Sequence, residues 1–322
     1  MQTIQQEIDE RTNLTSSNKL ELLLFRLGED ANLNRNELFG INVFKIREII
    51  PMPTITAMAG SHPHMMGVVD LRGQIIPVID LPAVTGCTPK TGLNILLITE
   101  YARSTQAFAV ESVEDIVRLD WRQVLSAEGN AAGGMVTSLA RLDGENSNSL
   151  AQVLDVETIL RNVMPPNESE IDSTSVCTPV DIKPGTVILA ADDSLIARTM
   201  IEQGLEAMGL PFIMCKTGKE AWDQLQAISD KAVTEGKTVH DKIALVLTDL
   251  EMPEMDGFTL TRNIKQDSRF SAIPVVIHSS LTGSTNEAHV KNVGADAYVA
   301  KFVAEDLANA LREALREALG KA

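Results

Sequence analysis

Short apolar runs separated by glycine, proline and polar residues make up most of the first half of the chain. These runs are rich in leucine, isoleucine, valine and phenylalanine, which favour β-strands, as in LELLLFRL at residues 20–27. Further strands are predicted over residues 67–71, 74–81, 93–99, 106–110 and 113–119. Helical patterns occur at residues 43–50 and 154–163. Many short strands with this punctuation predict an all-β barrel or sandwich.

In the second half the pattern changes to strands that alternate with helices. Residues 194–208 place an apolar stripe on one helical face, and residues 305–319 repeat leucine at four-residue spacing. Strands are predicted over residues 186–191, 212–215, 243–248, 274–278 and 297–299. Strands that alternate with helices predict a doubly wound α/β fold with a parallel sheet, whose ligand site lies at the carboxyl ends of the strands.

A polar segment separates the two patterns. The stretch from Met164 to Gly185 contains four prolines and several serine, threonine and acidic residues, and it lacks apolar periodicity. The chain is therefore expected to be multidomain. The expected parts are an N-terminal arm at residues 1–17, a β-rich domain at 18–164, a linker at 165–184 and an α/β domain at 185–322.

Composition narrows the classes of function. The 322 residues carry a formal net charge of −16, and the sequence pI is about 4.8. An acidic surface repels nucleic-acid phosphates and anionic lipid, so we expect neither nucleic-acid binding nor direct membrane insertion. The N-terminus lacks the apolar core of a signal peptide, and no apolar run reaches the ~20 residues of a membrane span. We therefore expect a cytoplasmic protein.

Polar side chains follow four of the five strands predicted in the second half. Asp192 and Asp193 follow the first strand, Asp249 follows the third, Ser279 the fourth and Lys301 the fifth. These groups are expected to converge, because the carboxyl ends of parallel strands share one edge of a sheet. Clustered carboxylates repel one another unless a cation lies among them, and oxygen ligands suit Mg²⁺. One carboxylate is then available as a nucleophile toward phosphorus, with the hydroxyl and the ammonium holding the phosphoryl oxygens.

This pattern resembles the receiver domain of two-component response regulators, over nearly the whole second domain (residues 186–320). The acid pair and the stretch DLEMPEMDG, which begins at Asp249, stand in the family's order and spacing. The resemblance implies that Asp249 is the phosphoacceptor. It also implies an Mg²⁺ site formed by the carboxylates of Asp192, Asp193 and Asp249 and the backbone carbonyl of Glu251.

The same resemblance assigns roles to residues near the last two strands. It implies that Ser279 and Lys301 bind the phosphoryl group and that Tyr298 is an aromatic switch that moves inward with Ser279. The chain departs from the family after Lys301, where receiver domains usually carry a proline in a cis peptide bond and this sequence has Phe302. A cis bond before phenylalanine costs about 3–4 kcal/mol, so this departure bears on where the Lys301 ammonium lies.

The most distinctive stretch of the first half is GVVDLRGQIIPVIDL, at residues 67–81. Gly73 can supply the positive φ of a tight turn, so the stretch predicts a β-hairpin with Arg72 at its tip. An arginine at a hairpin tip indicates a binding surface only weakly, because such a residue is more often simply solvated. No spacing typical of a nucleophilic or metal site accompanies the hairpin.

The first half resembles the CheW-type coupling domains of bacterial chemotaxis over residues 20–163. The matching segments are LLLFRLG, ELFGINVFKIREII, MMGVVDLRGQIIPVIDL, AFAVESVEDIV and QVLDVETIL. The resemblance implies two SH3-like β-barrel lobes and a role in bridging methyl-accepting chemoreceptors to a chemotaxis histidine kinase. The positions that match the family's partner-binding region are Ile46, Glu48, Gly67 and Arg72.

A coupling domain followed by a receiver domain resembles the CheV type of chemotaxis coupling protein. The resemblance implies an adaptor at receptor arrays, on the inner face of the membrane, that is tuned by Mg²⁺-dependent phosphorylation of Asp249. The alternative is a phosphate sink that drains phosphoryl groups from the kinase, with the coupling domain as a tether. A DNA-binding regulator needs a basic output domain, which this chain lacks. Neither remaining hypothesis makes the protein an enzyme beyond self-catalysed phosphoryl acceptance and hydrolysis.

Histidines offer two further candidate sites. His62 and His64 are two residues apart but have no cysteine or acid at a suitable spacing, so we do not interpret them as a metal site. His278 lies in a predicted buried strand beside the expected phosphorylation site. We interpret it as a core histidine with its hydrogen bonds satisfied, rather than as a phosphohistidine.

Overall fold

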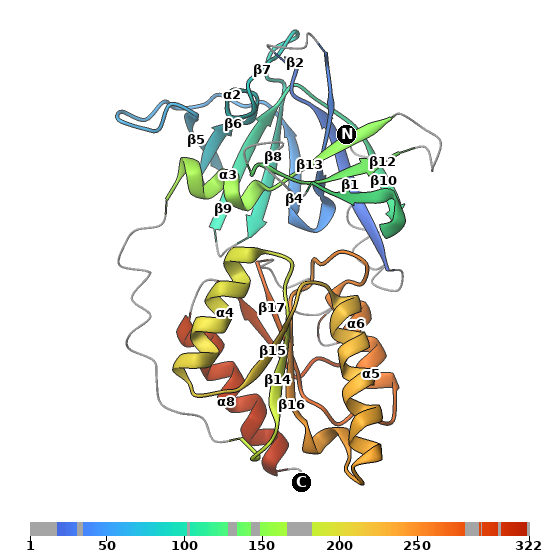
Figure 1. Cartoon of the computed structure of the whole chain (residues 1–322). Coiled ribbons are helices and arrows are strands. Elements are labelled where there is room, and N and C mark those ends of the chain that lie inside the picture. The colour runs from blue at the N-terminus through green and yellow to red at the C-terminus, as the bar shows by residue number, and fades with distance from the viewer. Residues whose placement is uncertain are drawn as a thin grey trace. The chain divides into compact units, whose positions relative to one another are not determined.

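The computed structural model describes residues 18–30, 35–101, 104–127, 134–142, 149–165, 182–280, 290, 292–301 and 304–320. The predicted N-terminal arm, most of the predicted linker and Phe302 lie outside these residues. The chain divides into two compact units, one β-rich and one α/β (Figure 1). Within the described residues, no helix is both long enough and apolar enough to span a membrane.

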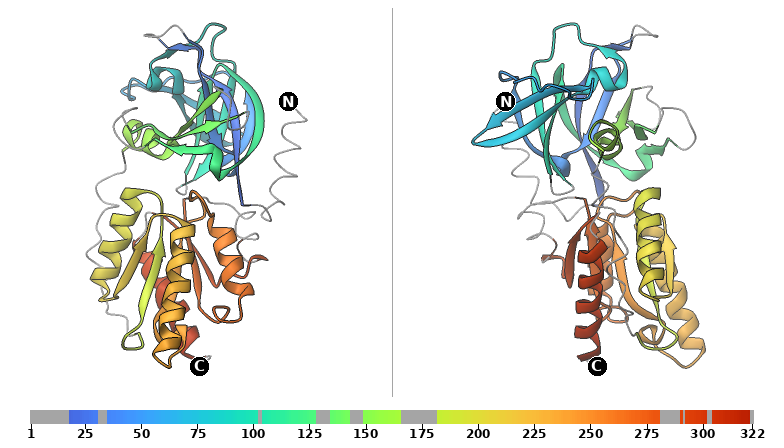
Figure 2. Two further views of the ribbon diagram at one scale, coloured as in Figure 1. Left: turned by 45° about the vertical axis from the view of Figure 1, so that its right-hand side comes forward. Right: turned by 90° about the vertical axis from the view of Figure 1, so that its left-hand side faces the viewer.

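The β-rich unit is built on two sheets (Figure 2). The first has the strand order β10-β1-β3-β13-β12-β11, and the second has the order β4-β8-β9-β6-β5. Strands of the first sheet are β1 (Lys19–Arg26), β3 (Leu38–Asn42), β10 (Ser112–Asp120), β11 (Val124–Ser126), β12 (Val136–Arg141) and β13 (Leu150–Leu154). Strands of the second are β4 (Ile46–Pro51), β5 (Met65–Leu71), β6 (Gln74–Asp80), β8 (Ile95–Tyr101) and β9 (Ser104–Val110). The remaining elements are β2 (Glu29–Asp30), η1 (Val43–Lys45), α2 (Leu81–Thr85), β7 (Cys87–Thr88), η2 (Trp121–Gln123) and α3 (Val156–Val163).

Strand β1 is buried on both faces, and this explains how the two sheets share a core. Leu23 and Phe25 enter an apolar cluster that also receives side chains from the second sheet and from α3. Leu22 and Leu24 point to the other face, into a separate cluster within the first sheet. Another cluster, which includes Ile76, lies within the second sheet. Each sheet therefore encloses apolar side chains of its own, as the prediction of two β-barrel lobes requires.

The helix predicted at residues 43–50 is wrong over most of its length. Only η1 is helical, a single 3₁₀ turn, and the rest is strand β4, which pairs antiparallel with β8. The isoleucines at positions 46, 49 and 50 account for the difference. Their β-branched side chains favour an extended backbone, and an apolar run this short fits either period. The helix predicted at residues 154–163 is confirmed as α3.

The α/β unit has the predicted parallel sheet, in the order β15-β14-β16-β17-β18. Helices α4 and α8 cover one face of it, and α5 and α6 cover the other (Figure 1). The strands are β14 (Val187–Ala191), β15 (Phe212–Cys215), β16 (Ile243–Thr248), β17 (Val275–Ser279) and β18 (Ala297–Ala300). The helices are α4 (Leu195–Ala207), α5 (Gly218–Thr234), η5 (Val239–Asp241), α6 (Gly257–Gln266) and α8 (Ala304–Gly320).

Candidate functional sites

The ends of strands β14 and β16 bring two aspartates together. In the parallel register Ala191 pairs with Thr248, so Asp192 and Asp249 leave the sheet at the same level. The Asp249 amide donates a hydrogen bond to the Ala191 carbonyl over 2.9 Å, which fixes this level. One carboxylate oxygen from each of Asp192, Asp193 and Asp249 lies within 4.8 Å of the others. We call these three residues the acidic cluster; Asp192 and Asp249 are buried, and Asp193 is exposed.

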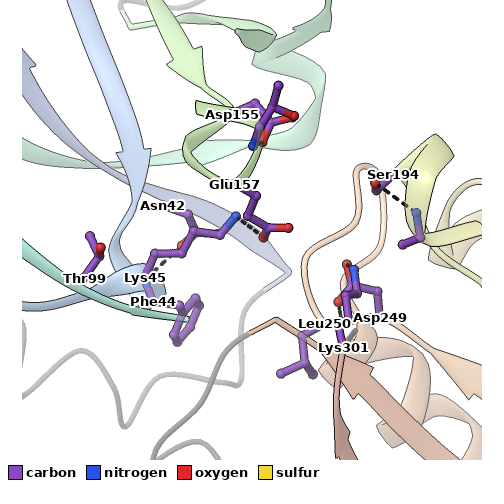
Figure 3. A network of polar contacts seen from close by, with 12 residues as sticks. Asn42, Phe44, Lys45, Thr99, Asp155, Glu157, Ser194, Asp249, Leu250 and Lys301 are labelled. Atoms are coloured by element: carbon purple, nitrogen blue, oxygen red, sulfur yellow. Dashed lines mark hydrogen bonds and ion pairs between the residues drawn. The ribbon is translucent and has the colours of Figure 1, made fainter. Parts of the chain in front are cut away.

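Lys301, which follows β18, places its ammonium in the acidic cluster. Its Nζ lies 2.8 Å from an oxygen of Asp192 and 2.8 Å from an oxygen of Asp249, and all three side chains are less than 5 % exposed. Figure 3 shows the side chains of Asp249 and Lys301 next to one another. The Lys301 amide also donates to the Ser279 carbonyl over 2.9 Å. The lysine therefore lies in the cluster although Phe302 stands where the receiver family usually has proline.

The electrostatics of the acidic cluster suit a divalent cation. Burial raises the pKa of Asp192 to about 6; Lys301 opposes the shift and the charge of Asp249 adds to it. One ammonium thus does not compensate for three carboxylates held so close together. Oxygen ligands of this kind, open to solvent on the Asp193 side, fit Mg²⁺ with some of its water retained.

Glycines hold the loop that follows Asp249. A Cβ on Gly257 would lie 2.0 Å from the Asp249 carbonyl oxygen, and a Cβ on Gly218 would lie 2.2 Å from the Met255 carbonyl oxygen. The Gly257 amide donates to the Leu250 carbonyl over 2.9 Å, and the Leu250 amide donates to Asp249 Oδ1 over 2.7 Å. The phosphoacceptor predicted from the sequence is therefore fixed by backbone packing. Motif spacing alone did not reveal why these glycines are needed.

The ends of β17 and β18 carry the other residues predicted for this site. Ser279 is fully buried at the end of β17, and Tyr298 is half-buried on β18. Glu251 lies in the loop two residues after Asp249, and its carbonyl as a metal ligand stays a prediction.

His278 is buried as expected, but its Nδ1 has no hydrogen-bond partner among the described residues. Burial, and then the charge of Lys301, lower the pKa of His278 to about 3, so the imidazole is neutral.

Arg198, on the first turn of α4, was not singled out in the sequence. Its Nη1 donates to the backbone carbonyls of Asp192 and Asp193, over 2.9 and 2.8 Å. The sequence signal that would have revealed Arg198 is its spacing along the chain from the acid pair Asp192 and Asp193. A long side chain on the first turn of a helix points back toward the residues that precede that helix.

The tip of the β5–β6 hairpin lies against strand β4. Leu71 pairs with Gln74, so the turn consists of Arg72 and Gly73, both with positive φ. Arg72 Nη2 lies 2.7 Å from Glu48 Oε1, and Arg47 Nη1 donates to Gln74 Oε1 over 3.2 Å. Because β4 and β5 are opposite edges of the second sheet, these contacts require the sheet to curl into a barrel.

The four residues predicted for partner binding differ in accessibility. The side chain of Arg72 is 71 % exposed and that of Glu48 is 17 % exposed. Ile46 lies in the core shared by the two sheets. Gly67 is buried, and a Cβ there would lie 2.1 Å from the Thr56 carbonyl oxygen, in a segment that pairs with β5. Of the four, only Glu48 and Arg72 expose side-chain atoms that a partner could reach, whereas Ile46 and Gly67 are packed within the lobe.

Known proteins match both units of the chain. Residues 21–164 match the family of CheW-like domains, and residues 188–313 match the response regulator receiver domain. The chemotaxis protein CheV3 of Helicobacter pylori is 31 % identical over 292 residues, covering 88 % of this chain and 91 % of the relative. The chain belongs to the CheV family of chemotaxis proteins. CheV2 of the same organism is 29 % identical over 311 residues, covering 92 % of this chain and 94 % of the relative.

Membership of the CheV family relates the two units to each other. The hairpin with Arg72 at its tip belongs to the CheW-like domain, and the acidic cluster belongs to the receiver domain. A chemotaxis protein that carries both domains combines a coupling module with a module of the phosphorelay type.

Proposed function

We propose that this CheV-family protein is an adaptor that couples chemoreceptors to a histidine kinase in the cytoplasm, and that phosphorylation of Asp249 tunes the coupling. The observation that carries the proposal is the position of the Lys301 ammonium, 2.8 Å from both Asp192 and Asp249 in a buried acidic cluster. An ammonium beside a buried carboxylate nucleophile is the arrangement that phosphoryl transfer requires, because charge on the phosphoryl oxygens must be stabilised as it shifts.

The chemistry follows from the groups present. An Mg²⁺ ion held by Asp192, Asp193, Asp249 and the carbonyl of Glu251 would neutralise charge on the phosphoryl group. The phosphoryl donor is the phosphorylated histidine of the kinase. A carboxylate oxygen of Asp249 bonds to phosphorus while the bond from phosphorus to the imidazole nitrogen of that histidine breaks, and the nitrogen keeps the electron pair. Lys301 and Ser279 hold the phosphoryl oxygens. Water later cleaves the acyl phosphate, which regenerates the Asp249 carboxylate and releases inorganic phosphate. This self-catalysed acceptance and hydrolysis is the reaction that we propose for the protein.

The coupling half supplies the docking surface. Arg72 and Glu48 form a polar patch on the curled second sheet, and we assign to this patch the contact with receptor and kinase. In the receiver half, Ser279 and Tyr298 occupy neighbouring strands at the edge of the site. Their inward movement on phosphorylation would shift the population of docking-competent molecules.

Phosphorylation is tested with the full-length protein, Mg²⁺ and a radiolabelled histidine kinase, with acetyl phosphate as a second donor. We expect Asp249→Ala to abolish labelling while both domains stay folded, and Lys301→Ala to label at least about tenfold more slowly. Asp223→Ala, which removes an exposed carboxylate of α5, is the matched control and should label normally. Labelling that persists in Asp249→Ala would identify a different acceptor.

Coupling is tested by assembling receptor, kinase and this protein with and without the phosphoryl donor. Arg72→Ala should weaken the ternary complex, and Arg122→Ala, which removes an exposed arginine of η2, should leave it intact. The wild-type complex should change on phosphorylation, whereas the Asp249→Ala complex should not. Equal coupling in the two states would remove the adaptor switch and leave the phosphate sink as the explanation.

A further inference from the structure

We propose that Arg198 is a positioning residue of the metal site, which it serves by holding the turn between β14 and α4. The proposal rests on the function proposed above for the acidic cluster, and it concerns a residue outside that cluster. Arg198 binds the backbone that carries the two carboxylates, through the carbonyls of Asp192 and Asp193.

The geometry of the turn explains why these two carbonyls need a donor. The last sheet contact of this segment is the Asp192 amide, which donates to the Cys215 carbonyl. The first helical bond of α4 runs from the Arg198 amide to the Ser194 carbonyl over 2.9 Å. The carbonyls of Asp192 and Asp193 lie between these two bonds. Nη1 of Arg198 donates to both, so one guanidinium nitrogen closes the turn.

Arg198 holds the backbone of both acids of the turn, and Asp192 has further fixed points. Its Oδ1 accepts from the Ser194 amide over 2.9 Å, and its Oδ2 faces Lys301. Asp193 lies at the exposed edge of the cluster, and its carbonyl accepts from Arg198 over 2.8 Å. Loss of Arg198 would therefore loosen the backbone that places Asp193 on the solvent side of the metal site, while the contacts of Asp192 with Ser194 and Lys301 would stay in place.

This role predicts an effect on metal affinity more than on the phosphoryl-transfer step. Groups that orient metal ligands typically change metal affinity by about 10–100-fold when they are removed. We expect Arg198→Met to weaken Mg²⁺ binding by at least about tenfold, and Arg198→Lys, which keeps a charged donor, to recover part of the loss. At saturating Mg²⁺ the labelling rate of Arg198→Met should return to near the wild-type value, because Asp249 and Lys301 are unaltered.

The experiment is a calorimetric Mg²⁺ titration of the full-length protein, paired with the rate of labelling by acetyl phosphate as a function of Mg²⁺ concentration. Arg316→Met, which removes an exposed arginine from α8, is the matched control and should bind Mg²⁺ like the wild type. Circular dichroism in Mg²⁺-free buffer reports whether each variant is folded. If Arg198→Met does not fold, Arg198→Gln, which keeps one neutral donor, replaces it with the same expectation.

The outcomes separate this proposal from the function on which it rests. A lower melting temperature in Arg198→Met and Arg198→Gln with an unchanged Mg²⁺ dissociation constant would overturn the positioning role, since Arg198 would then serve only the fold. A labelling rate that stays low at saturating Mg²⁺ would overturn it too. If the wild type binds Mg²⁺ but Asp249 is never labelled, the proposed function fails, while the calorimetric comparison still decides the role of Arg198.

Discussion

The acidic cluster and the hairpin tip are both built from opposite charges in contact, yet they lie in contrasting surroundings. Lys301 and its two aspartate partners are less than 5 % exposed, whereas Arg72 is 71 % exposed against Glu48. An exposed ion pair contributes about 0–1 kcal/mol to stability. Buried charges carry a desolvation cost that only well-placed partners offset. A fold that keeps charged groups buried does so at a cost in stability. The acidic cluster is therefore a stronger indication of chemistry than the exposed ion pair at the hairpin tip.

The two sites also differ in how they are held. The acidic cluster is fixed by backbone contacts from several sides, including Gly257 against Asp249 and Arg198 against the β14–α4 turn. The hairpin tip is held by side chains that reach across the surface of a curled sheet. Phosphoryl transfer needs groups fixed to within a fraction of an ångström, whereas docking tolerates side-chain adjustment.

A pair of glycine substitutions tests this difference with the largest expected effect. In Gly257→Ala the new methyl group meets the Asp249 carbonyl oxygen at 2.0 Å, so the backbone that carries the proposed phosphoacceptor must move. We expect a loss of about 3 kcal/mol in the free energy of unfolding and a severe loss of labelling. In Gly73→Ala nothing lies within 4 Å of the new Cβ, and only the φ of +83° is unfavourable. The expected cost there is about 1 kcal/mol, with labelling unchanged.

Tryptophan fluorescence can measure each half separately. The chain has two tryptophans, Trp121 in the coupling half and Trp222 in the receiver half, where Trp222 packs edge-on against Phe270. Urea unfolding in a Trp121→Phe background follows the receiver, and the converse Trp222→Phe background follows the coupling domain. A Gly257→Ala protein with normal stability and labelling would show that the loop adapts, and would remove the distinction between a rigid site and an adjustable surface.

The sequence predicted the location of the acidic cluster because parallel strands impose it. Once five alternating strands were recognised, Asp192, Asp249 and Lys301 had to lie at one edge of the sheet, and the structure brings them together. The contact between Glu48 and Arg72 had no comparable rule. It depends on how far the second sheet curls, which is set by packing between distant segments. In addition, β4, the strand that carries Glu48, is predicted as a helix from the sequence.

Acid stability tests the buried side of the comparison with a medium effect. His278 has a pKa of about 3 in the fold and about 6.5 when unfolded. The unfolded chain therefore binds more protons between these values, and stability present above pH 6.5 is lost as the pH falls. The loss approaches about 1.4 kcal/mol per pH unit, or about 2 kcal/mol between pH 7.5 and pH 5. We expect His278→Val to lose about 2 kcal/mol less over this range.

The measurement is urea unfolding of the Trp121→Phe protein at pH 7.5 and pH 5.0 in Mg²⁺-free buffer. The raised pKa of Asp192 changes stability with pH in the opposite direction, and it is common to both proteins. Comparison of the wild type with His278→Val therefore removes the contribution of Asp192. His62→Val in the coupling half, where the imidazole is exposed, serves as the comparison variant and is expected to follow the wild type. Parallel pH profiles for His278→Val and the wild type would contradict a buried neutral imidazole.

The smallest effect on stability is expected at the hairpin tip. Reversing both charges, Glu48→Arg with Arg72→Glu, should change the unfolding free energy of the coupling half by less than about 1 kcal/mol, because the pair is exposed on the arginine side. Each single reversal places like charges together and should cost slightly more.

Binding to receptor and kinase should respond differently from stability. The double reversal keeps the ion pair but inverts the patch presented to a partner, so affinity should fall even though stability is retained. Titration calorimetry of the complex, alongside unfolding in the Trp222→Phe background, measures the two effects; full binding by the double variant would mean that the pair serves the closure of the barrel and that the partner docks elsewhere.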